Sequence, residues 1–317
     1  MLLSVLFSMV SYLPAKEISS VTYPVGELGE QWKFPSDHLP VGGSVGNIHF
    51  AMWNILDTDY LNYIVSNSQG LRDSLIMELN IPVKQGSLFT EREALVVTSI
   101  HQMINHESIP RSLLALQETG TEVFKKLQET LPSHLKMIPS RIEDLMHGDI
   151  FIYDDNVFDF VDFTYSHYKV NPGNTMMALT LVEKNTGMVY RFFQSHVPGG
   201  PINSDPAREE MANTLFNTFD PTMITIVMGD MNRSPDFFLK NFENAAKSRG
   251  ISQPFKNMPI SYPTHINTHC EASWIDNIFI ANPHKNIHSQ ASDANSFFDE
   301  LKNTVELLEK LTVERLQ

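Results

Sequence analysis

Ser36-Asp37-His38-Leu39-Pro40-Val41 stands near the beginning of the chain, where a polar triplet carrying an imidazole runs into apolar residues. Further along, several apolar stretches that read as strands also end in short polar motifs. These motifs are Trp53-Asn54, Leu116-Gln117-Glu118, Ser195-His196, Gly229-Asp230-Met231-Asn232 and Trp274-Ile275-Asp276-Asn277. Because sites in α/β proteins gather at strand ends, the pattern predicts one site assembled from distant parts of the chain.

Strands and helices alternate along the chain, which predicts an α/β fold. A turn signal at Asn185-Thr186-Gly187 joins two of the strands into a hairpin. Such an arrangement favours a four-layer α/β sandwich, in which two mixed sheets pack face to face and helices flank them. The predicted strands are 48–54, 112–117, 150–153, 176–182, 188–194, 223–228 and 274–280, and the predicted helices are 121–131, 206–219 and 237–247.

The polar triplet has a predictable position relative to the first strand. Two apolar runs, 39–45 and 48–54, flank Gly46-Asn47, a pair typical of a two-residue hairpin turn. In that register, residues whose numbers sum to 93 face each other, so Leu39 opposes Asn54 and His38 opposes Ile55. We therefore expect Asp37 and His38 to reach the sheet end that carries Asn54.

Composition limits the domain organisation and the partners. The chain has 317 residues, of which 42% are hydrophobic, and no linker or repeat interrupts it, so we expect a single domain over residues 1–317. Asp and Glu outnumber Lys and Arg by 37 to 23, which disfavours duplex DNA as a partner. Cys270 is the only cysteine and excludes an intramolecular disulfide.

Both ends of the chain carry apolar segments. Within an N-terminal extension, 1–33, the first thirteen residues are apolar but lack the basic residues of a secretory signal and are too short to span a bilayer. No transmembrane span is expected, and cytoplasmic and secreted locations both stay open. The spacing of apolar residues over 296–317 predicts an amphipathic helix, which we expect to pack on its own domain rather than on a partner. The sequence leaves the oligomeric state open.

Together, the motifs over residues 34 to 280 resemble the endonuclease/exonuclease/phosphatase superfamily of metal-dependent phosphoesterases. In this family the Ser-Asp-His element normally closes the domain, so the resemblance implies a circularly permuted order in which that element precedes the first strand. Ser292-Asp293-Ala294 stands at the usual place, but alanine cannot exchange a proton. The segments 35–40 and 147–153 are closer to the nocturnin-like deadenylase branch and to bacterial proteins of unassigned substrate. Met146-His147 replaces the tyrosine of the abasic-site nucleases and disfavours that activity.

The resemblance implies a metal site and a set of catalytic side chains. Glu118 is expected to bind Mg²⁺ or Mn²⁺, with Asn54 and Asp37 completing or supporting the shell, because hard cations prefer oxygen ligands. Asp230 and Asn232 are expected on one side of an extended segment, with Met231 in the core. The Asp230 carboxylate would act on the attacking water, and the Asn232 amide would contact a phosphoryl oxygen.

The histidines are expected to contact the phosphate. His38 would contact the scissile group while Asp276 binds its other ring nitrogen, and His196 would contact a phosphate oxygen or assist the leaving group. Either Asp230 or His38 takes the proton of the water. We favour Asp230, because a histidine held by a carboxylate serves better as a donor.

The predicted function is hydrolysis of a phosphodiester or phosphomonoester by in-line attack of an activated water. One alternative is an exonuclease or deadenylase acting on RNA 3′ ends, and another is a non-catalytic binding module that retains the fold. The substrate could be a small molecule, a lipid headgroup or a single-stranded RNA end. His265 and His269, followed by Cys270, also suggest zinc, but without a second ligand pair we favour a substrate-facing loop.

Overall fold

The structure is a computed structural model that describes residues 21–22, 36, 38, 40–57, 87–105, 110–140, 148–200, 204–258, 260, 264–266, 271–283 and 289–291. Several predictions concern residues outside this set. They include Asp37, the Met146-His147 and Ser292-Asp293-Ala294 segments, His269, Cys270, the 296–317 helix and nearly all of the 1–33 extension.

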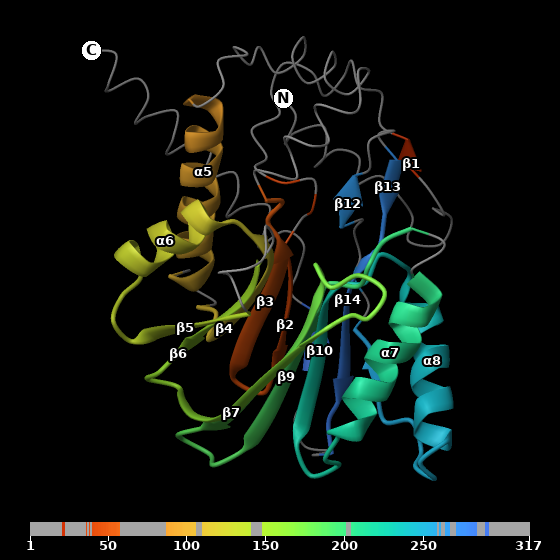
Figure 1. The fold of residues 1–317 in the computed structure, drawn as a ribbon. Helices are drawn as coiled ribbons and strands as arrows, with labels where there is room; N and C mark the ends of the chain where they lie inside the picture. Colours follow the sequence, from red (N-terminus) through yellow and green to blue (C-terminus); the bar gives the residue numbers. More distant parts are fainter. Residues whose placement is uncertain are drawn as a thin grey trace, which may run out of the picture.

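Two six-stranded mixed sheets form the centre of the fold (Figure 1), with the strand orders β15-β2-β3-β4-β6-β5 and β11-β14-β10-β9-β8-β7. The first sheet comprises β2 (Val41–Val45), β3 (Ile48–Asn54), β4 (Leu113–Thr119), β5 (Leu135–Pro139), β6 (Gly148–Asp154) and β15 (Ser289–Ala291). The second comprises β7 (Phe158–His167), β8 (Thr175–Glu183), β9 (Val189–Ser195), β10 (Ile224–Asp230), β11 (Lys256–Asn257) and β14 (Asp276–Ala281). A small third sheet contains β1 (Val21–Thr22), β12 (His265–Ile266) and β13 (Glu271–Ser273).

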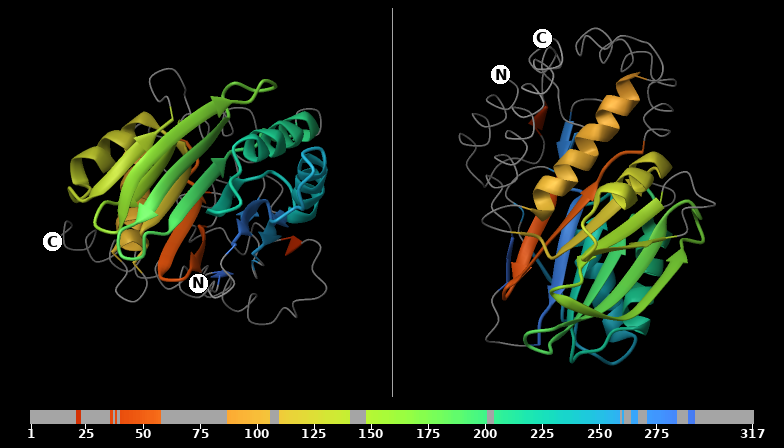
Figure 2. Two further views of the ribbon diagram at one scale, coloured as in Figure 1. Left: turned by 90° about the horizontal axis from the view of Figure 1, so that it is seen from below. Right: turned by 90° about the vertical axis from the view of Figure 1, so that its left-hand side faces the viewer.

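Helices cover the outer faces of the two sheets (Figure 2), which gives the predicted four layers. Helices α5 (Ser87–Ile104) and α6 (Thr121–Thr130) pack on the first sheet, and α7 (Ser204–Asn217) and α8 (Pro235–Lys247) pack on the second. Between the sheets lies an apolar layer that includes Phe50, Phe151, Phe192 and Met228. The fold class predicted from the sequence is therefore confirmed.

The hairpin of β2 and β3 has the predicted register. Val41 faces Met52 and Val45 faces Ile48, so the paired numbers sum to 93, and Gly46 in the turn has a φ of 60°. Leu39, predicted to face Asn54, lies outside the described residues. Among the described residues the pairing of β2 with β3 ends at Val41, and His38 forms a bridge with His265 in place of the predicted position opposite Ile55. Pro40, which has no N–H to donate, stands where the ladder stops.

Side-chain hydrogen bonds hold Ser36 and His38 at the end of β3. The Trp53 indole N–H donates to the His38 carbonyl over 2.9 Å, and the Ser36 hydroxyl donates to the Asn54 carbonyl over 2.7 Å. Ser36 and His38 therefore reach the sheet end that carries Asn54, as predicted for His38, through these side-chain bonds.

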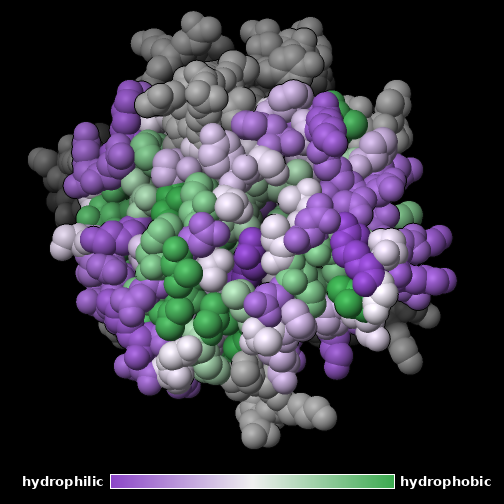
Figure 3. Space-filling view, turned by 60° about the horizontal axis from the view of Figure 1, so that its bottom comes forward, coloured by the Kyte–Doolittle hydropathy of each residue, from purple (hydrophilic) through white to green (hydrophobic). Residues whose placement is uncertain are grey.

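Strand β7 forms an edge of the second sheet and was missed from the sequence. Phe160, Val161 and Tyr165 on this strand are each between 42% and 53% exposed. Hydrophobic side chains are visible among polar ones in the space-filling view (Figure 3).

Within the described residues, no helix is both long and apolar enough to cross a membrane.

Gly229 of β10 provides a test of how tightly neighbouring strands pack. Its φ is 148°, and a Cβ atom there would lie 1.9 Å from the Ser195 carbonyl oxygen. We expect Gly229→Ala to lower the free energy of unfolding by roughly 3 kcal/mol or more, since strand backbone has to move. Gly187→Ala is the control, because Gly187 also has a positive φ but no atom within 4 Å of the added carbon. The Gly187→Ala substitution should lower the free energy of unfolding by only about 1 kcal/mol. Urea unfolding measures the free energy of unfolding of both variants. Equal losses of stability would contradict the close packing of Gly229 against the Ser195 carbonyl.

Candidate functional site

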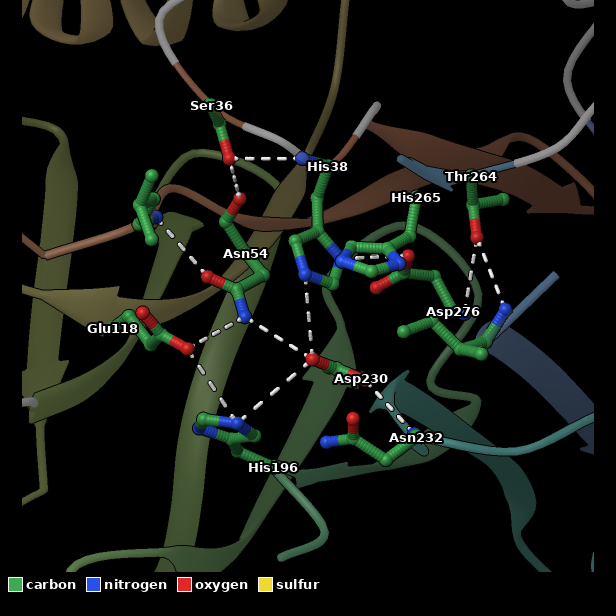
Figure 4. A network of polar contacts seen from close by, with 12 residues as sticks. Ser36, His38, Asn54, Glu118, His196, Asp230, Asn232, Thr264, His265 and Asp276 are labelled. Atoms are coloured by element: carbon green, nitrogen blue, oxygen red, sulfur yellow. Dashed lines mark hydrogen bonds and ion pairs between the residues drawn. The ribbon is translucent and has the colours of Figure 1, made fainter. Parts of the chain in front are cut away.

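The predicted site residues that the structure describes lie together where both sheets end (Figure 4). Asn54 and Glu118 come from the first sheet, and Asp230 and Asp276 come from the second. His38 precedes β2, and His196 directly follows β9. The side chains of these residues are buried, with the exception of His196. The site is thus built at the boundary between the sheets.

His38 and Asp276 form the predicted imidazole–carboxylate pair. The Nδ1 atom of His38 lies 2.9 Å from Asp276 Oδ2, and Nε2 lies 3.6 Å from Asp230 Oδ2. Asp276 is itself held by Thr264, whose hydroxyl oxygen accepts the Asp276 main-chain N–H over 3.1 Å. With Nδ1 bound to a carboxylate, the orientation of the ring is fixed and Nε2 is turned toward Asp230.

Asp230 and Asn232 depart from the extended conformation expected for them. Strand β10 ends at Asp230, and Asn232 has a φ of 51°. The carboxylate of Asp230 accepts the Asn232 main-chain N–H over 2.9 Å, which makes a turn that competes with the strand. The Asn232 amide donates to the Val197 carbonyl over 2.8 Å and so holds the loop after His196. Met231 is buried in the core, as predicted.

Glu118 lies at an irregularity of β4. The pairing of β4 with β6 shifts register between Leu116 and Thr119, and Glu118 has a φ of 53°. Non-glycine residues rarely adopt this left-handed conformation, and bulges commonly redirect a side chain near a site. Here the bulge directs the Glu118 carboxylate toward Asn54 and His196.

Asn54 joins the two sheets through its amide group. Its Nδ2 atom donates to Glu118 Oε1 over 2.9 Å and to Asp230 Oδ2 over 3.2 Å, while its Oδ1 accepts the Leu56 main-chain N–H. The amide nitrogen therefore faces both carboxylates. Of the two roles expected for Asn54, this geometry favours support of the metal shell.

His196 lies on the other side of the two carboxylates. Its Nε2 atom is 3.6 Å from Glu118 Oε1 and 3.8 Å from Asp230 Oδ2. The side chain is 15% exposed, more than those of its neighbours. It is therefore placed to contact a substrate that reaches Glu118 and Asp230.

The oxygen donors fit a hard divalent cation. Glu118 and Asp230 both direct a carboxylate oxygen to the same amide nitrogen, so two negative charges lie on one side of Asn54. Positive charge stabilises such an arrangement, and Mg²⁺ and Mn²⁺ prefer oxygen ligands. A second group of possible ligand atoms, from His38, Asp230 and Asp276, also lies within 4.8 Å of one another. In that group, however, His38 Nδ1 and Asp276 Oδ2 are already hydrogen-bonded to each other.

Sequence reasoning missed several polar residues that support the site. Asp149, Gln194 and Thr264 are all at least 98% buried, and each bonds to the backbone of a site strand. A signal for Asp149 was present, because it alternates with Phe151 and Tyr153 on the inner face of an otherwise apolar strand. His265 lies beside His38, with 4.5 Å between the ring centroids.

Comparisons with known proteins establish the fold. No protein-family model matches the chain, and no curated protein matches it significantly in sequence. The catalytic domain of human nocturnin, solved with a bound sulfate anion, is similar at 15% identity and a TM-score of 0.50, covering 88% of this chain and 91% of that one. A mannosyl-6-phosphatase from Bacteroides thetaiotaomicron has 16% identity and a TM-score of 0.49, with 74% and 85% covered. Truncated Caenorhabditis elegans TDP2 has 15% identity and a TM-score of 0.46, with 61% and 79% covered.

Structures described as endonuclease/exonuclease/phosphatase proteins are also among the similar ones. At 15% identity the similarity to nocturnin shows that the two chains share a fold. The permuted order implied by the motifs stays a prediction.

Binding of a divalent cation can be tested through stability. Mn²⁺ at about 100 times its dissociation constant should add about 2.7 kcal/mol to the free energy of unfolding and raise the melting temperature by roughly 5 °C. Glu118→Gln should remove most of this rise, because it replaces a charged oxygen ligand by an amide. Glu122→Gln is the control, since Glu122 is exposed and pairs with Lys125 on α6. A rise that survives Glu118→Gln would count against this residue as a ligand.

Proposed function

We propose that the chain is a divalent-metal-dependent phosphoesterase that hydrolyses a phosphodiester or phosphomonoester by in-line attack of water. The observation that carries this proposal is the position of Asp230, whose Oδ2 atom accepts from Asn54 and faces both His38 and His196. Phosphoester hydrolysis needs a positioned water, groups that stabilise charge on the phosphoryl oxygens and help for the leaving oxygen. This cluster offers a side chain for each task.

Glu118 would hold Mg²⁺ or Mn²⁺, with Asn54 orienting its carboxylate and Asp37 as a further expected ligand. The bound cation would polarise the phosphoryl oxygens and neutralise charge that develops on them. Asn54 serves this role by donating to Glu118 and Asp230 at once, which sets the two carboxylates in a common orientation.

Asp230 is the base that we favour for the attacking water. Its Oδ1 atom accepts the Asn232 N–H, so the side chain is fixed while Oδ2 faces the site. His38, held at Nδ1 by Asp276, would carry a proton on Nε2 and donate it toward a phosphoryl oxygen. The buried Asp276 carboxylate beside the ring favours the positively charged imidazole, which carries a proton on both nitrogens.

His196 and Asn232 complete the proposed machinery. The Nε2 atom of His196 faces the same carboxylates as the proposed water and would contact a phosphate oxygen or the leaving group. Asn232 was expected to bind a phosphoryl oxygen through its amide. Its bond to Val197 fixes the loop after His196, and the second hydrogen of the same amide would serve the substrate.

The charge balance supports a small phosphoester over long nucleic acid. A formal net charge of −14 repels a polyanion, whereas a single phosphate can bind through the cation and the histidines. An RNA 3′ end is the second substrate that the sequence motifs suggest. A panel of nucleotides, phosphoinositides, sphingomyelin and oligo(A) with Mg²⁺ or Mn²⁺ identifies the substrate, and turnover of oligo(A) alone would favour the deadenylase reading.

Two substitutions test the reaction itself. Asp230→Asn and His38→Asn should each lower kcat/KM on bis-p-nitrophenyl phosphate by roughly 10²–10⁴, because each removes a group that transfers a proton in the transition state. A chelator should abolish the activity of the wild type. His101→Asn, on α5 and bonded to Thr130, is the matched control. Full activity in both variants, or in chelator, would contradict the proposed reaction. A wild type that binds no Mn²⁺ and turns over no phosphoester would favour the binding-module alternative.

Asp276 tests the orientation of the His38 ring. Asp276→Asn can place its amide hydrogens against Nδ1 and so favour the wrong tautomer, which should lower kcat by roughly 10²–10⁴ with a small change in KM. The pH profile of kcat should change shape as well. A variant with an unchanged profile and rate would show that the bond to Nδ1 has no part in catalysis.

A further inference from the structure

The left-handed conformation of Glu118 is held by main-chain hydrogen bonds to side chains and strands around the bulge. The Glu118 N–H donates to Asp149 Oδ1 over 3.4 Å, and the Gln117 carbonyl accepts from the Ile55 N–H over 3.1 Å. The Leu116 carbonyl accepts from Gln194 Nε2 over 2.7 Å. The backbone of the bulge is therefore bonded at each of its three successive residues.

One of these supports crosses the boundary between the sheets, and a second is itself held from across that boundary. Gln194 belongs to β9 of the second sheet and reaches Leu116 in β4 of the first. Asp149 lies on β6 of the first sheet and accepts the hydroxyl of Thr175 from β8 of the second. Since Asp149, Thr175 and Gln194 are all at least 98% buried, these bonds are shielded from water and leave little freedom to move.

Asp149 is also anchored within the first sheet by Ser140, which directly follows β5. Its N–H donates to the Ser140 hydroxyl over 2.8 Å, and its carbonyl accepts the Ser140 N–H over 2.7 Å. Thr175 also connects to the other side of the site, because its carbonyl accepts the His196 N–H over 3.2 Å. A short path of hydrogen bonds thus runs from Glu118 through Asp149 and Thr175 to His196.

We propose that Asp149, with Gln194 as its counterpart on the other side of the bulge, is a positioning residue for the Glu118 carboxylate. This inference rests on the proposed function, because it assigns Asp149 to the conformation of the proposed metal ligand. Asp149 acts as a hydrogen-bond acceptor in this role, and its charge is not required. Groups that orient metal ligands in this way typically change metal affinity by about 10–100-fold when they are removed.

The experiment combines Mn²⁺ binding, measured by electron paramagnetic resonance, with hydrogen exchange of the metal-free protein. Asp149→Ala should weaken Mn²⁺ binding by roughly 10–100-fold and speed amide exchange over residues 113–119. Asp149→Asn should restore most of both, because its Oδ1 can still accept the Glu118 N–H. Gln194→Met should also speed exchange, since it removes the donor to Leu116 at similar volume. Asp154→Ala, at the far end of β6, is the control.

The outcomes separate the possibilities. If Asp149→Asn binds Mn²⁺ as weakly as Asp149→Ala, the charge of Asp149 matters and the positioning role is wrong. Unchanged affinity and exchange in Asp149→Ala would also overturn it. If the wild type binds no Mn²⁺, the proposed function fails by that result. The exchange rates of the metal-free variants then decide alone whether Asp149 holds the bulge.

Discussion

Polar side chains that bond across the boundary between the two sheets determine the geometry of the site. The layer between the sheets is otherwise apolar, and apolar contacts are not directional, so by themselves they tolerate small shifts of one sheet over the other. Asn54 to Asp230, Thr175 to Asp149 and Gln194 to Leu116 are directional bonds between the sheets. A buried donor left without its acceptor costs about 1–3 kcal/mol, so a shift of either sheet is opposed at this end of the sandwich.

Local chemistry was sufficient to predict much of the fold. The Gly46-Asn47 turn fixes the register of β2 and β3 because a two-residue loop leaves one way for the strands to pair. The buried strands were found because their apolar runs are bounded by turn residues, and their polar ends predicted which side chains meet. Asp230 and His38 lie 3.6 Å apart through Oδ2 and Nε2, although 192 positions separate them in sequence by their numbers.

What could not be predicted depends on neighbours that are distant in sequence. The conformation of Glu118 follows from its bond to Asp149 and from the bond of Gln194 to Leu116. Nothing within the Leu-Gln-Glu motif indicates a bulge. The turn at Asn232 was misjudged because a strand pattern and an Asp-x-Asn turn compete there, and the bond to Val197 favours the turn. Strand β7 was missed because its exposed aromatic residues at the sheet edge do not give the pattern of a half-buried strand.

The wide separation of the bonded pairs has a consequence for how the chain acquires its structure. His38 and Asp276 are 238 positions apart, and Asn54 and Asp230 are 176 apart, so each bond closes a very long loop. Contacts of this kind form late and slow the folding reaction. A partly folded intermediate does not yet hold Glu118 and Asp230 in one site, so a cation held by Glu118 would bind the finished state best and would protect it against proteolysis.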